Sequence, residues 1–211
     1  MFAITNPTTK PHFFLNIQFS IKRLFDIFFS ILLLIILSEV LLFISLIVKI
    51  TSPGPILFRQ KRLGQNEKFF TMLKFRSMYA SGVGQEFDKT NQKLNKSIND
   101  KRVTTFGRFI RRTSLDELPQ LINILKGDMS FVGPRPLIPE MLEHLPSFRQ
   151  LRSTFKPGLT GLWQVRDRMN NTKAEYMIKY DLDYVSKYSL LLDIRIIFLT
   201  IPAVIKGGGA I

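Results

Sequence analysis

An apolar run near the N-terminus constrains the fold of this chain more than any other feature of its sequence. As an α-helix, the 22 residues of this run are about 33 Å long, roughly the thickness of the hydrocarbon core of a bilayer. No other segment is apolar enough to surround such a helix in a soluble core. We therefore predict a membrane helix within residues 21–50. The run extends from Ile27 to Val48, and its polar members are Ser30, Ser38, Glu39 and Ser45.

The flanks and the middle of this run favour a re-entrant helix. Lys22 and Arg23 precede the run and Lys49 follows it. Basic residues at both ends favour a cytoplasmic location for both ends. A carboxylate at mid-bilayer is costly unless it is paired or reaches an interface. We therefore predict that the helix bends at Ser38 and Glu39 and returns to the same face of the membrane, with a simple span as the alternative.

The chain as a whole is strongly basic. It carries a net charge of +14, and residues 59–112 hold 14 Lys/Arg against 4 Asp/Glu. Such a surface suits anionic lipid head groups or a pocket for phosphate-bearing substrates. It adjoins the membrane segment and matches no nucleic-acid motif, so we expect no nucleic-acid partner. The absence of cysteine excludes disulfide scaffolds and thiol nucleophiles, and two histidines argue against a His-rich metal site.

The pattern predicts an α+β fold that is mostly helical, with a small β-hairpin and interfacial amphipathic helices beside one N-terminal re-entrant membrane helix. The hairpin is expected from β-forming runs at 56–58 and 69–75. The apolar run 190–205 contains Asp193 and Arg195, which is typical of an amphipathic helix on the membrane surface or on the domain. The expected divisions are a tail at 1–20, the membrane helix at 21–50, a domain at 51–206 and a tail at 207–211. A polar loop is expected at 80–99, and helices near 103–112, 115–126 and 172–187.

Candidate chemistry is densest around an adjacent pair of acids, Asp116 and Glu117. Ser114 and Glu117 form a capping-box pattern, and Gly127 is a helix stop. This pattern places both acids in the first turn of a helix, where the helix dipole favours ionised carboxylates. Two acids there are often ordinary capping residues, and that interpretation stays open.

Nearby arginines indicate a phosphate site. Arg111 and Arg112 precede the acids, and Arg135 lies between two prolines that fix its backbone. A rigid arginine suits bidentate recognition of phosphate. An ionised aspartate beside such groups could attack phosphorus and form an acyl phosphate. Chemistry of this kind on a pyrophosphate commonly uses Mg²⁺ held by carboxylates and phosphate oxygens.

These motifs together resemble the small monotopic phosphoglycosyl transferases, the bacterial sugar transferase family. The resemblance covers roughly residues 21–206 in the order of the family. The matching segments are Lys22-Arg-Leu-Phe-Asp26, Ser52-Pro-Gly-Pro-Ile-Leu-Phe58, Gln60-Lys-Arg-Leu-Gly64, Lys74-Phe-Arg-Ser-Met78, Ser114-Leu-Asp-Glu-Leu-Pro-Gln120, Lys126-Gly-Asp-Met-Ser-Phe-Val-Gly-Pro-Arg-Pro136, Lys156-Pro-Gly-Leu-Thr-Gly161, Trp163-Gln-Val165 and Leu190-Leu-Leu-Asp193.

The resemblance implies an enzyme of the bacterial cytoplasmic (inner) membrane whose catalytic domain lies on the cytoplasmic face. Such an enzyme moves a sugar 1-phosphate from a UDP-sugar to a polyprenyl (undecaprenyl) phosphate, releases UMP and initiates lipid-linked glycan assembly. Its partners would be membrane lipids and downstream glycosyltransferases. Carried over, Asp116 would be the nucleophile and Glu117 its partner, both as Mg²⁺ ligands. The implied substrate-binding residues are Arg111, Arg135, Lys74, Arg168 and Asp181.

The chain departs from the family pattern at two places. Ser38-Glu39 stands where the family usually has Ser-Pro, and proline is the helix breaker of the re-entrant topology. Arg166-Asp167 stands where Asn-Gly is common before the arginine at Arg168. Two other functions remain as alternatives. One is a membrane-anchored binding or scaffold protein with a basic face for lipid or polyanions, and the other is a catalytically idle paralogue.

Overall fold

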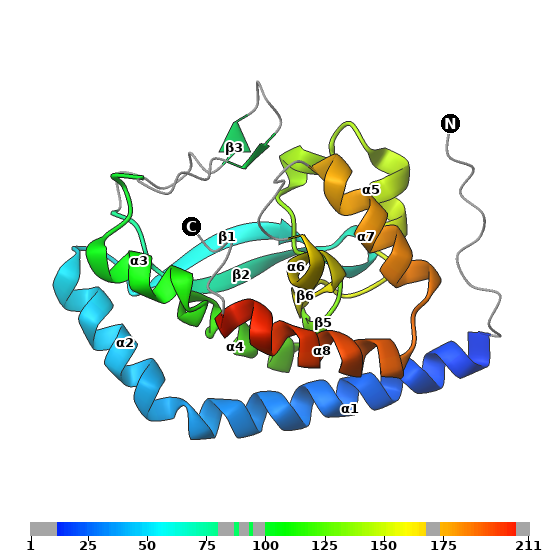
Figure 1. Cartoon of the computed structure of the whole chain (residues 1–211), viewed down its shortest axis with the longest axis horizontal. Helices are drawn as coiled ribbons and strands as arrows, with labels where there is room; N and C mark the ends of the chain where they lie inside the picture. Colours follow the sequence, from blue (N-terminus) through cyan, green and yellow to red (C-terminus); the bar gives the residue numbers. More distant parts are fainter. Residues whose placement is uncertain (1–11, 80–86, 89–92, 95–99, 168–173, 206–211) are drawn as a thin grey trace.

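The computed structural model describes residues 12–79, 87–88, 93–94, 100–167 and 174–205. The protein is mostly helical with a small antiparallel sheet, as the sequence predicts (Figure 1). In chain order the helices are α1 (His12–Ile36), α2 (Ser38–Thr51), α3 (Thr105–Arg112), α4 (Gln120–Lys126), α5 (Pro146–Arg152), α6 (Leu162–Arg166), α7 (Ala174–Ser186) and α8 (Leu190–Ile205). The strands are β1 (Leu57–Leu63), β2 (Phe69–Phe75), β3 (Phe87–Asp88), β4 (Lys93–Leu94), β5 (Ser130–Val132) and β6 (Gly158–Thr160), and the 3-10 turns are η1 (Gln65–Glu67), η3 (Leu115–Glu117) and η4 (Pro139–Leu142).

The apolar run folds as two helices that meet at a bend of 64°. The break falls at Leu37, and the Ser38 hydroxyl donates to the carbonyl of Ile35 at 2.8 Å. The predicted bend at Ser38 and Glu39 is thus confirmed although no proline is present there. Glu39 is exposed on the outer side. Helix α1 begins at His12, inside the segment expected to be a tail, and residues 1–11 lie outside the described part of the chain.

No single helix within the described residues has the length and apolar composition needed to cross a membrane. The pair Leu15–Ile36 and Ser38–Thr51 passes that test only when its two helices are taken together. By length and composition the pair could therefore be either a broken span or a re-entrant loop.

The predicted hairpin is confirmed as β1 and β2. Their antiparallel register runs from Leu57 opposite Phe75 to Leu63 opposite Phe69, with η1 in the turn. β1 is longer than the predicted run because the exposed Arg59 and Lys61 alternate with the less exposed Phe58, Gln60 and Arg62, which suits a strand with one solvated face. Of the expected loop at 80–99, the described parts are β3 and β4, which pair antiparallel.

The predicted helix at 115–126 is wrong as a single helix. Residues Leu115–Glu117 form a 3-10 turn, and α4 begins only at Gln120. Ser114 takes a left-handed conformation (φ 59°) with no side-chain cap, so the capping box does not form. Pro119 lacks an N–H and cannot donate the bond that would join the two pieces. The predicted end is confirmed, because Gly127 (φ 92°) terminates α4.

The other predicted helices are confirmed with small changes in their limits. Helix α3 begins after Thr104, whose side chain accepts a hydrogen bond from the N–H of Gly107 at 2.8 Å. Helix α7 covers the described part of the segment predicted at 172–187. The short helices α5 and α6 are not predicted, because runs of this length carry little periodicity.

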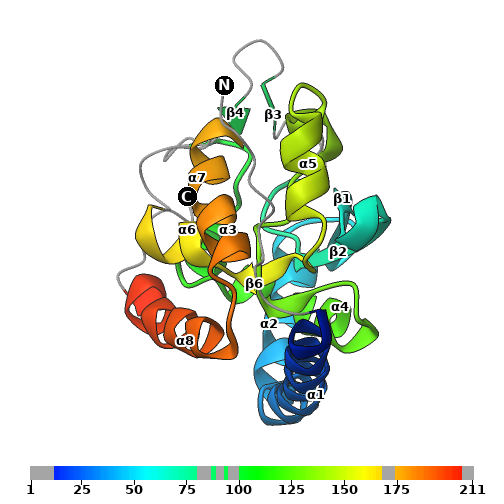
Figure 2. The ribbon, with the colours of Figure 1, turned by 90° about the vertical axis from the view of Figure 1, so that its right-hand side faces the viewer.

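Exposed large apolar side chains gather on α1, α2 and α8. Figure 1 shows α1 along the lower edge of the molecule with α8 beside it and α2 rising at one end, and Figure 2 shows α1 and α8 together at the bottom from the side. Most of the large exposed apolar residues in the described chain belong to these three helices, including Leu24, Phe28 and Ile35 on α1, Leu42 and Phe43 on α2, and Leu191, Phe198 and Ile205 on α8. Such an extensive apolar surface marks an interaction face.

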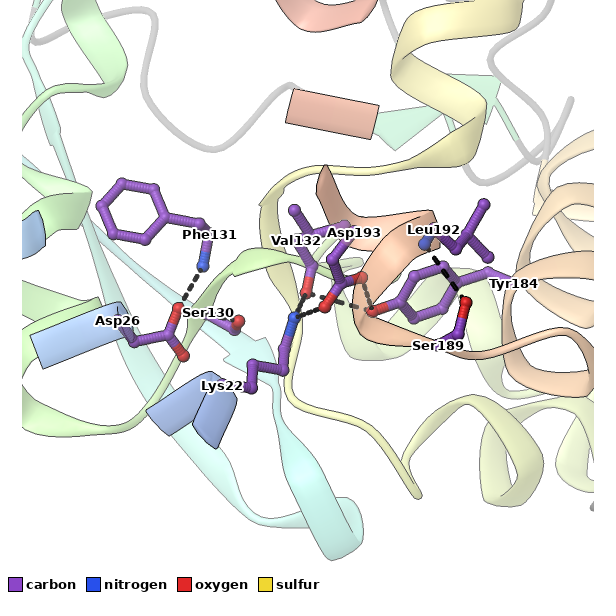
Figure 3. A network of polar contacts seen from close by, with 9 residues as sticks. All are labelled: Lys22, Asp26, Ser130, Phe131, Val132, Tyr184, Ser189, Leu192 and Asp193. Atoms are coloured by element: carbon purple, nitrogen blue, oxygen red, sulfur yellow. Dashed lines mark hydrogen bonds and ion pairs between the residues drawn. The ribbon is translucent and has the colours of Figure 1, made fainter. Parts of the chain in front are cut away.

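Buried polar contacts fasten α1 to the domain (Figure 3). The Lys22 ammonium group donates to the carbonyl of Val132 at 2.8 Å and forms an ion pair with Asp193 of α8. The Tyr184 hydroxyl donates to the same carboxylate at 2.8 Å. The Asp26 carboxylate accepts from the N–H of Phe131 at 3.0 Å. Helix α8, predicted from its apolar run, is therefore held to α1 by its one acidic residue, which faces inward.

Candidate active site

A basic pocket lies between the hairpin, the acid-bearing turn and the segment that contains Arg135. Three of its lining residues, Arg62, Lys74 and Arg135, are cationic and one, Glu117, is acidic. The pocket therefore has a positive lining that suits phosphate groups. Its lining residues are Arg62, Met72, Lys74, Glu117, Gln120, Arg135, Pro136, Gly158 and Leu159.

An ion pair joins β2 to the acid-bearing turn. The Lys74 ammonium nitrogen lies 2.9 Å from Oε1 of Glu117, and both side chains are largely buried. Asp116 precedes Glu117 in η3 and is 8% exposed, and it is not among the residues that line the pocket. The two acids therefore share one turn but differ in their access to the pocket.

The turn that carries the acids packs on α3 and β2 and joins a buried cluster that includes residues of α2. Leu115 and Leu118, on either side of the acids, contact a buried cluster that includes Ile44 and Val48 of α2 and Ile110 of α3. The same turn follows Ser114, whose left-handed backbone costs about 1–2 kcal/mol for a residue other than glycine. The acids therefore lie in a turn whose flanking leucines join the same buried cluster as Ile44 and Val48 of α2.

The segment carrying Arg135 is packed tightly against β6. A Cβ atom added to Gly133 would lie 2.3 Å from the carbonyl oxygen of Lys156, and one added to Gly158 would lie 2.2 Å from the nitrogen of Gly133. Only glycine permits this approach. The Arg135 guanidinium lies over the ring of Trp163, 5.5 Å from its centroid, which orients it by a cation–π contact.

Two of the implied substrate-binding residues within the described chain, Arg111 and Asp181, do not line the pocket. Arg111 is half-buried at the end of α3, which packs against η3. The hydrogen bond from Arg102 is the main cause that lowers the pKa of the Asp100 carboxyl to about 2, and the charge of Arg111 adds to this effect. Asp181 is paired with Arg152, and burial raises the pKa of its carboxyl. Arg168 lies outside the described residues.

Sequence reasoning assigned no role to two polar residues of the pocket, Arg62 and Gln120. Both are buried and both belong to motifs that carry the resemblance, which was the available signal. Two further arginines of those motifs hold helix ends. Arg23 donates to the carbonyls of Ile124 and Leu125 at the end of α4, and Arg76 donates to those of Val48 and Ser52 at the end of α2.

The donor set at the turn suits Mg²⁺. Mg²⁺ is usually held by one or two carboxylates, with the remaining ligands from substrate phosphates and water. Asp116 and Glu117 supply such a pair of carboxylates. In the described part of the chain no group of three or more His, Asp or Glu side chains could hold a metal ion, so phosphate oxygens would have to complete the coordination.

The basic lining of the pocket suits a protein that binds phosphate groups. The bacterial sugar transferase family matches residues 17–207, and the chain belongs to that family. The chain is 42% identical over 198 residues to the exopolysaccharide production protein ExoY of Sinorhizobium fredii, covering 90% of this chain and 87% of that protein.

Two longer relatives are similar to this chain over part of their length. It is 44% identical to the UDP-glucose:undecaprenyl-phosphate glucose-1-phosphate transferase of Escherichia coli, over 86% of this chain and 39% of that protein. It is 42% identical to the undecaprenyl-phosphate galactose phosphotransferase of Salmonella typhimurium, over 90% of this chain and 41% of that protein. The chain thus spans less than half the length of these two relatives.

Replacing Lys74 with methionine is expected to lower transferase activity about 10–100-fold. The change removes both a pocket cation and the partner of Glu117, and hydrogen bonds between charged groups contribute about 1.5–3 kcal/mol. The measurement is kcat/KM by UMP release, beside the thermal midpoint of the same preparation. The matched control is Lys61→Met on the exposed side of β1. Equal activity of the two variants would contradict a role for Lys74 in the site.

Proposed function

We propose that this protein transfers a sugar 1-phosphate from a UDP-sugar to a polyprenyl phosphate and releases UMP. The observation that carries the proposal is the pairing of Lys74 with Glu117 beside Asp116, at a basic pocket whose acid-bearing turn shares a buried cluster with α2. The names of the Escherichia coli and Salmonella relatives, which specify undecaprenyl-phosphate sugar phosphotransferases, support the acceptor. The Escherichia coli name also supports a UDP-sugar donor.

The transfer proceeds in two displacements at the phosphorus that bears the sugar. In the first, a carboxylate oxygen of Asp116 attacks this phosphorus, and the bond to the bridging pyrophosphate oxygen breaks with its electron pair leaving on UMP. In the second, a phosphate oxygen of the polyprenyl phosphate attacks the same phosphorus and expels the Asp116 carboxylate. The products are UMP and a polyprenyl diphosphate sugar. Because Asp116 is only 8% exposed, its surroundings keep most bulk water from competing for the phosphosugar.

The pocket residues hold the charges of the substrates. Arg135 and Arg62 bind phosphate oxygens by their guanidinium groups, and Lys74 adds a third positive charge while fixing Glu117. Mg²⁺ held by Asp116 and Glu117 would supply positive charge to the pyrophosphate when bound. These interactions stabilise the negative charge that moves onto the leaving UMP.

The apolar face of α1, α2 and α8 is proposed to lie in the cytoplasmic leaflet of the bacterial inner membrane. Helix α2 contributes to this face and also shares a buried cluster with the acid-bearing turn. A lipid-dissolved acceptor and a water-soluble donor can meet only at such a boundary. The positive charge of segment 59–112 favours anionic head groups and phosphate substrates.

Both ends of the bent helix pair are expected on the cytoplasmic side. The chain has no cysteine, so Asn16→Cys and Lys49→Cys each introduce a single thiol at an exposed position near one end of the pair. A membrane-impermeant maleimide should label neither site in intact spheroplasts and both sites after lysis. A single-cysteine periplasmic protein controls for labelling from outside. Labelling of just one of the two sites in spheroplasts would show a simple span.

The proposed reaction is tested by UMP release from detergent extracts supplied with undecaprenyl phosphate, Mg²⁺ and a panel of UDP-sugars. Release that needs the lipid phosphate and Mg²⁺ is expected with at least one donor, and that donor names the sugar. If folded protein releases no UMP with any donor but binds anionic vesicles in a salt-dependent manner, the scaffold alternative is correct. Binding of a UDP-sugar without release would identify an idle paralogue.

A further inference from the structure

We propose that Arg152, held by Asp181, is a positioning residue that fixes Arg135 toward the pocket. This inference rests on the proposed function of Arg135 in binding substrate phosphate. Arg152 is not among the lining residues of the pocket and can act there only through Arg135. Its guanidinium group donates to the backbone carbonyl of Arg135.

Successive carbonyls in the Arg135 segment are each held by a different donor. The Pro134 carbonyl accepts from the N–H of Gly158 at 2.9 Å, and the Leu137 carbonyl accepts from the N–H of Leu63 at 3.2 Å. Between them, the Arg135 carbonyl accepts from Arg152, and the Pro136 carbonyl accepts from Arg62 at 3.4 Å. Two prolines also fix φ in this segment. The backbone of Arg135 is therefore held in one conformation by β6, α5 and β1.

The guanidinium group of Arg152 is itself oriented from two sides. Its Nε donates to Asp181 of α7 at 3.0 Å, and its Nη2 lies 3.0 Å from the same carboxylate oxygen. It also lies over the ring of Phe148, 5.4 Å from the centroid. Both charged side chains are 5% exposed, so bulk water does not compete for these bonds.

Stability alone does not account for this buried pair. Removing two charges from water is costly, and apolar residues of similar volume often replace a buried ion pair without loss of stability. An apolar pair cannot, however, donate to the Arg135 carbonyl. Arg152 donates from Nε to Asp181 and from Nη2 to that carbonyl. This arrangement suits a residue that orients the phosphate-binding arginine.

The test compares Arg152→Met/Asp181→Leu with a control on the same helix. The double variant leaves no unpaired buried charge, so it folds without the contact to Arg135. The control, Arg149→Met, removes an arginine whose partner is the half-exposed Glu67. We expect kcat/KM for UMP release to fall at least 30-fold, on the order of 2 kcal/mol, in the double variant and to stay unchanged in the control. A double variant with wild-type activity would overturn the proposal.

A second measurement does not need turnover. Trp163 is the only tryptophan in the chain, and the Arg135 guanidinium lies on its ring. The wavelength of its fluorescence emission maximum should shift in Arg135→Ala. It should shift in the same direction in Arg152→Met/Asp181→Leu and stay at the wild-type value in Arg149→Met. If wild type releases no UMP with any donor, the proposed function fails, and the emission still decides the positioning of Arg135. Emission of the double variant equal to wild type would overturn the inference.

A double-mutant cycle separates positioning from a general loss of structure. If Arg152 acts through Arg135, the triple variant Arg135→Ala/Arg152→Met/Asp181→Leu should have a kcat/KM less than 3-fold below that of Arg135→Ala alone. Two groups that act as a unit are non-additive in this way. Effects that multiply in full would show that Arg152 acts independently of Arg135 and would overturn the proposal.

Discussion

Replacing Asp116 with asparagine is expected to reduce UMP release by about 10⁴-fold or more while the protein stays folded and membrane-bound. The amide is nearly the same size as the carboxylate but is a far weaker nucleophile, and loss of a covalent nucleophile removes both displacements at once. The variant also loses one of two carboxylates available to Mg²⁺ at this turn. The measurement is UMP release at saturating donor and acceptor.

Intact-protein mass spectrometry distinguishes nucleophile from metal ligand. Wild type given a UDP-sugar without acceptor should gain the mass of one phosphosugar, and the Asp116→Asn variant should gain none. Glu117→Gln keeps the nucleophile, so a slower but detectable gain is expected there. Asp183→Asn changes an exposed acid of α7 and controls for the loss of a negative charge. Full activity of Asp116→Asn would disprove the assignment of the nucleophile.

Replacing Lys22 with methionine is expected to destabilise the folded protein by about 3 kcal/mol, because it leaves a charge buried without its ionic partner. The Lys22 ammonium group joins α1 to β5 and α8 through the Val132 carbonyl and the Asp193 carboxylate, as Figure 3 shows. After the change, Tyr184 still donates to Asp193, but the positive charge is gone. For a chain of this length the thermal midpoint should fall by about 6–12 °C.

Two companion variants define the cause of this loss. Lys187→Met removes an exposed ion pair with Asp183 and should change the free energy of unfolding by less than about 0.5 kcal/mol. Lys22→Met/Asp193→Leu removes both buried charges and should recover most of the lost stability. A single variant as stable as Lys187→Met would contradict the structural importance of the Lys22 contact.

The deficit of Lys22→Met should depend on pH. Burial raises the pKa of the Asp193 carboxyl, and the Lys22 charge opposes that rise in the wild type. Without Lys22 the folded-state pKa rises further. When the pKa of an acid is higher in the folded state than in the unfolded state, the folded state loses stability as the pH rises through the folded-state pKa. The stability deficit of Lys22→Met is therefore greatest at neutral pH. It shrinks toward acidic pH, where the Asp193 carboxyl is protonated in the folded state. Thermal midpoints measured across this range test the sign.

The contacts of α1 also explain how the proposed membrane helix and the candidate active site can form one unit. Arg23 holds the end of α4, which follows the acid-bearing turn, while Leu115 and Leu118 of the turn join a buried cluster that includes residues of α2. Movement of the bent pair relative to the domain would break these bonds. The site is therefore fixed in depth relative to the apolar face, which a reaction between a dissolved donor and a lipid acceptor requires.

Local sequence patterns determined the elements whose cause is local. The bend at Ser38 and Glu39 follows from a polar interruption of an apolar helix, and the end of α4 follows from the conformational freedom of Gly127. The hairpin follows from two β-forming runs around a turn. The acid pair and Arg135 were also identifiable from the sequence, because motif spacing and flanking prolines mark them.

Only the tertiary structure decided how these residues are held. The predicted helix over 115–126 divides at Pro119, which the sequence contains, but two other features of this turn are not visible in local spacing. They are the left-handed backbone of Ser114 and the packing of Leu115 and Leu118 on a buried cluster from α2, β2 and α3. Asp181 pairs with Arg152 instead of lining the pocket, and the buried Arg62 does line it. The partners in these contacts are distant in the sequence and are brought together by packing, so their free energy depends on the whole fold and not on any local pattern.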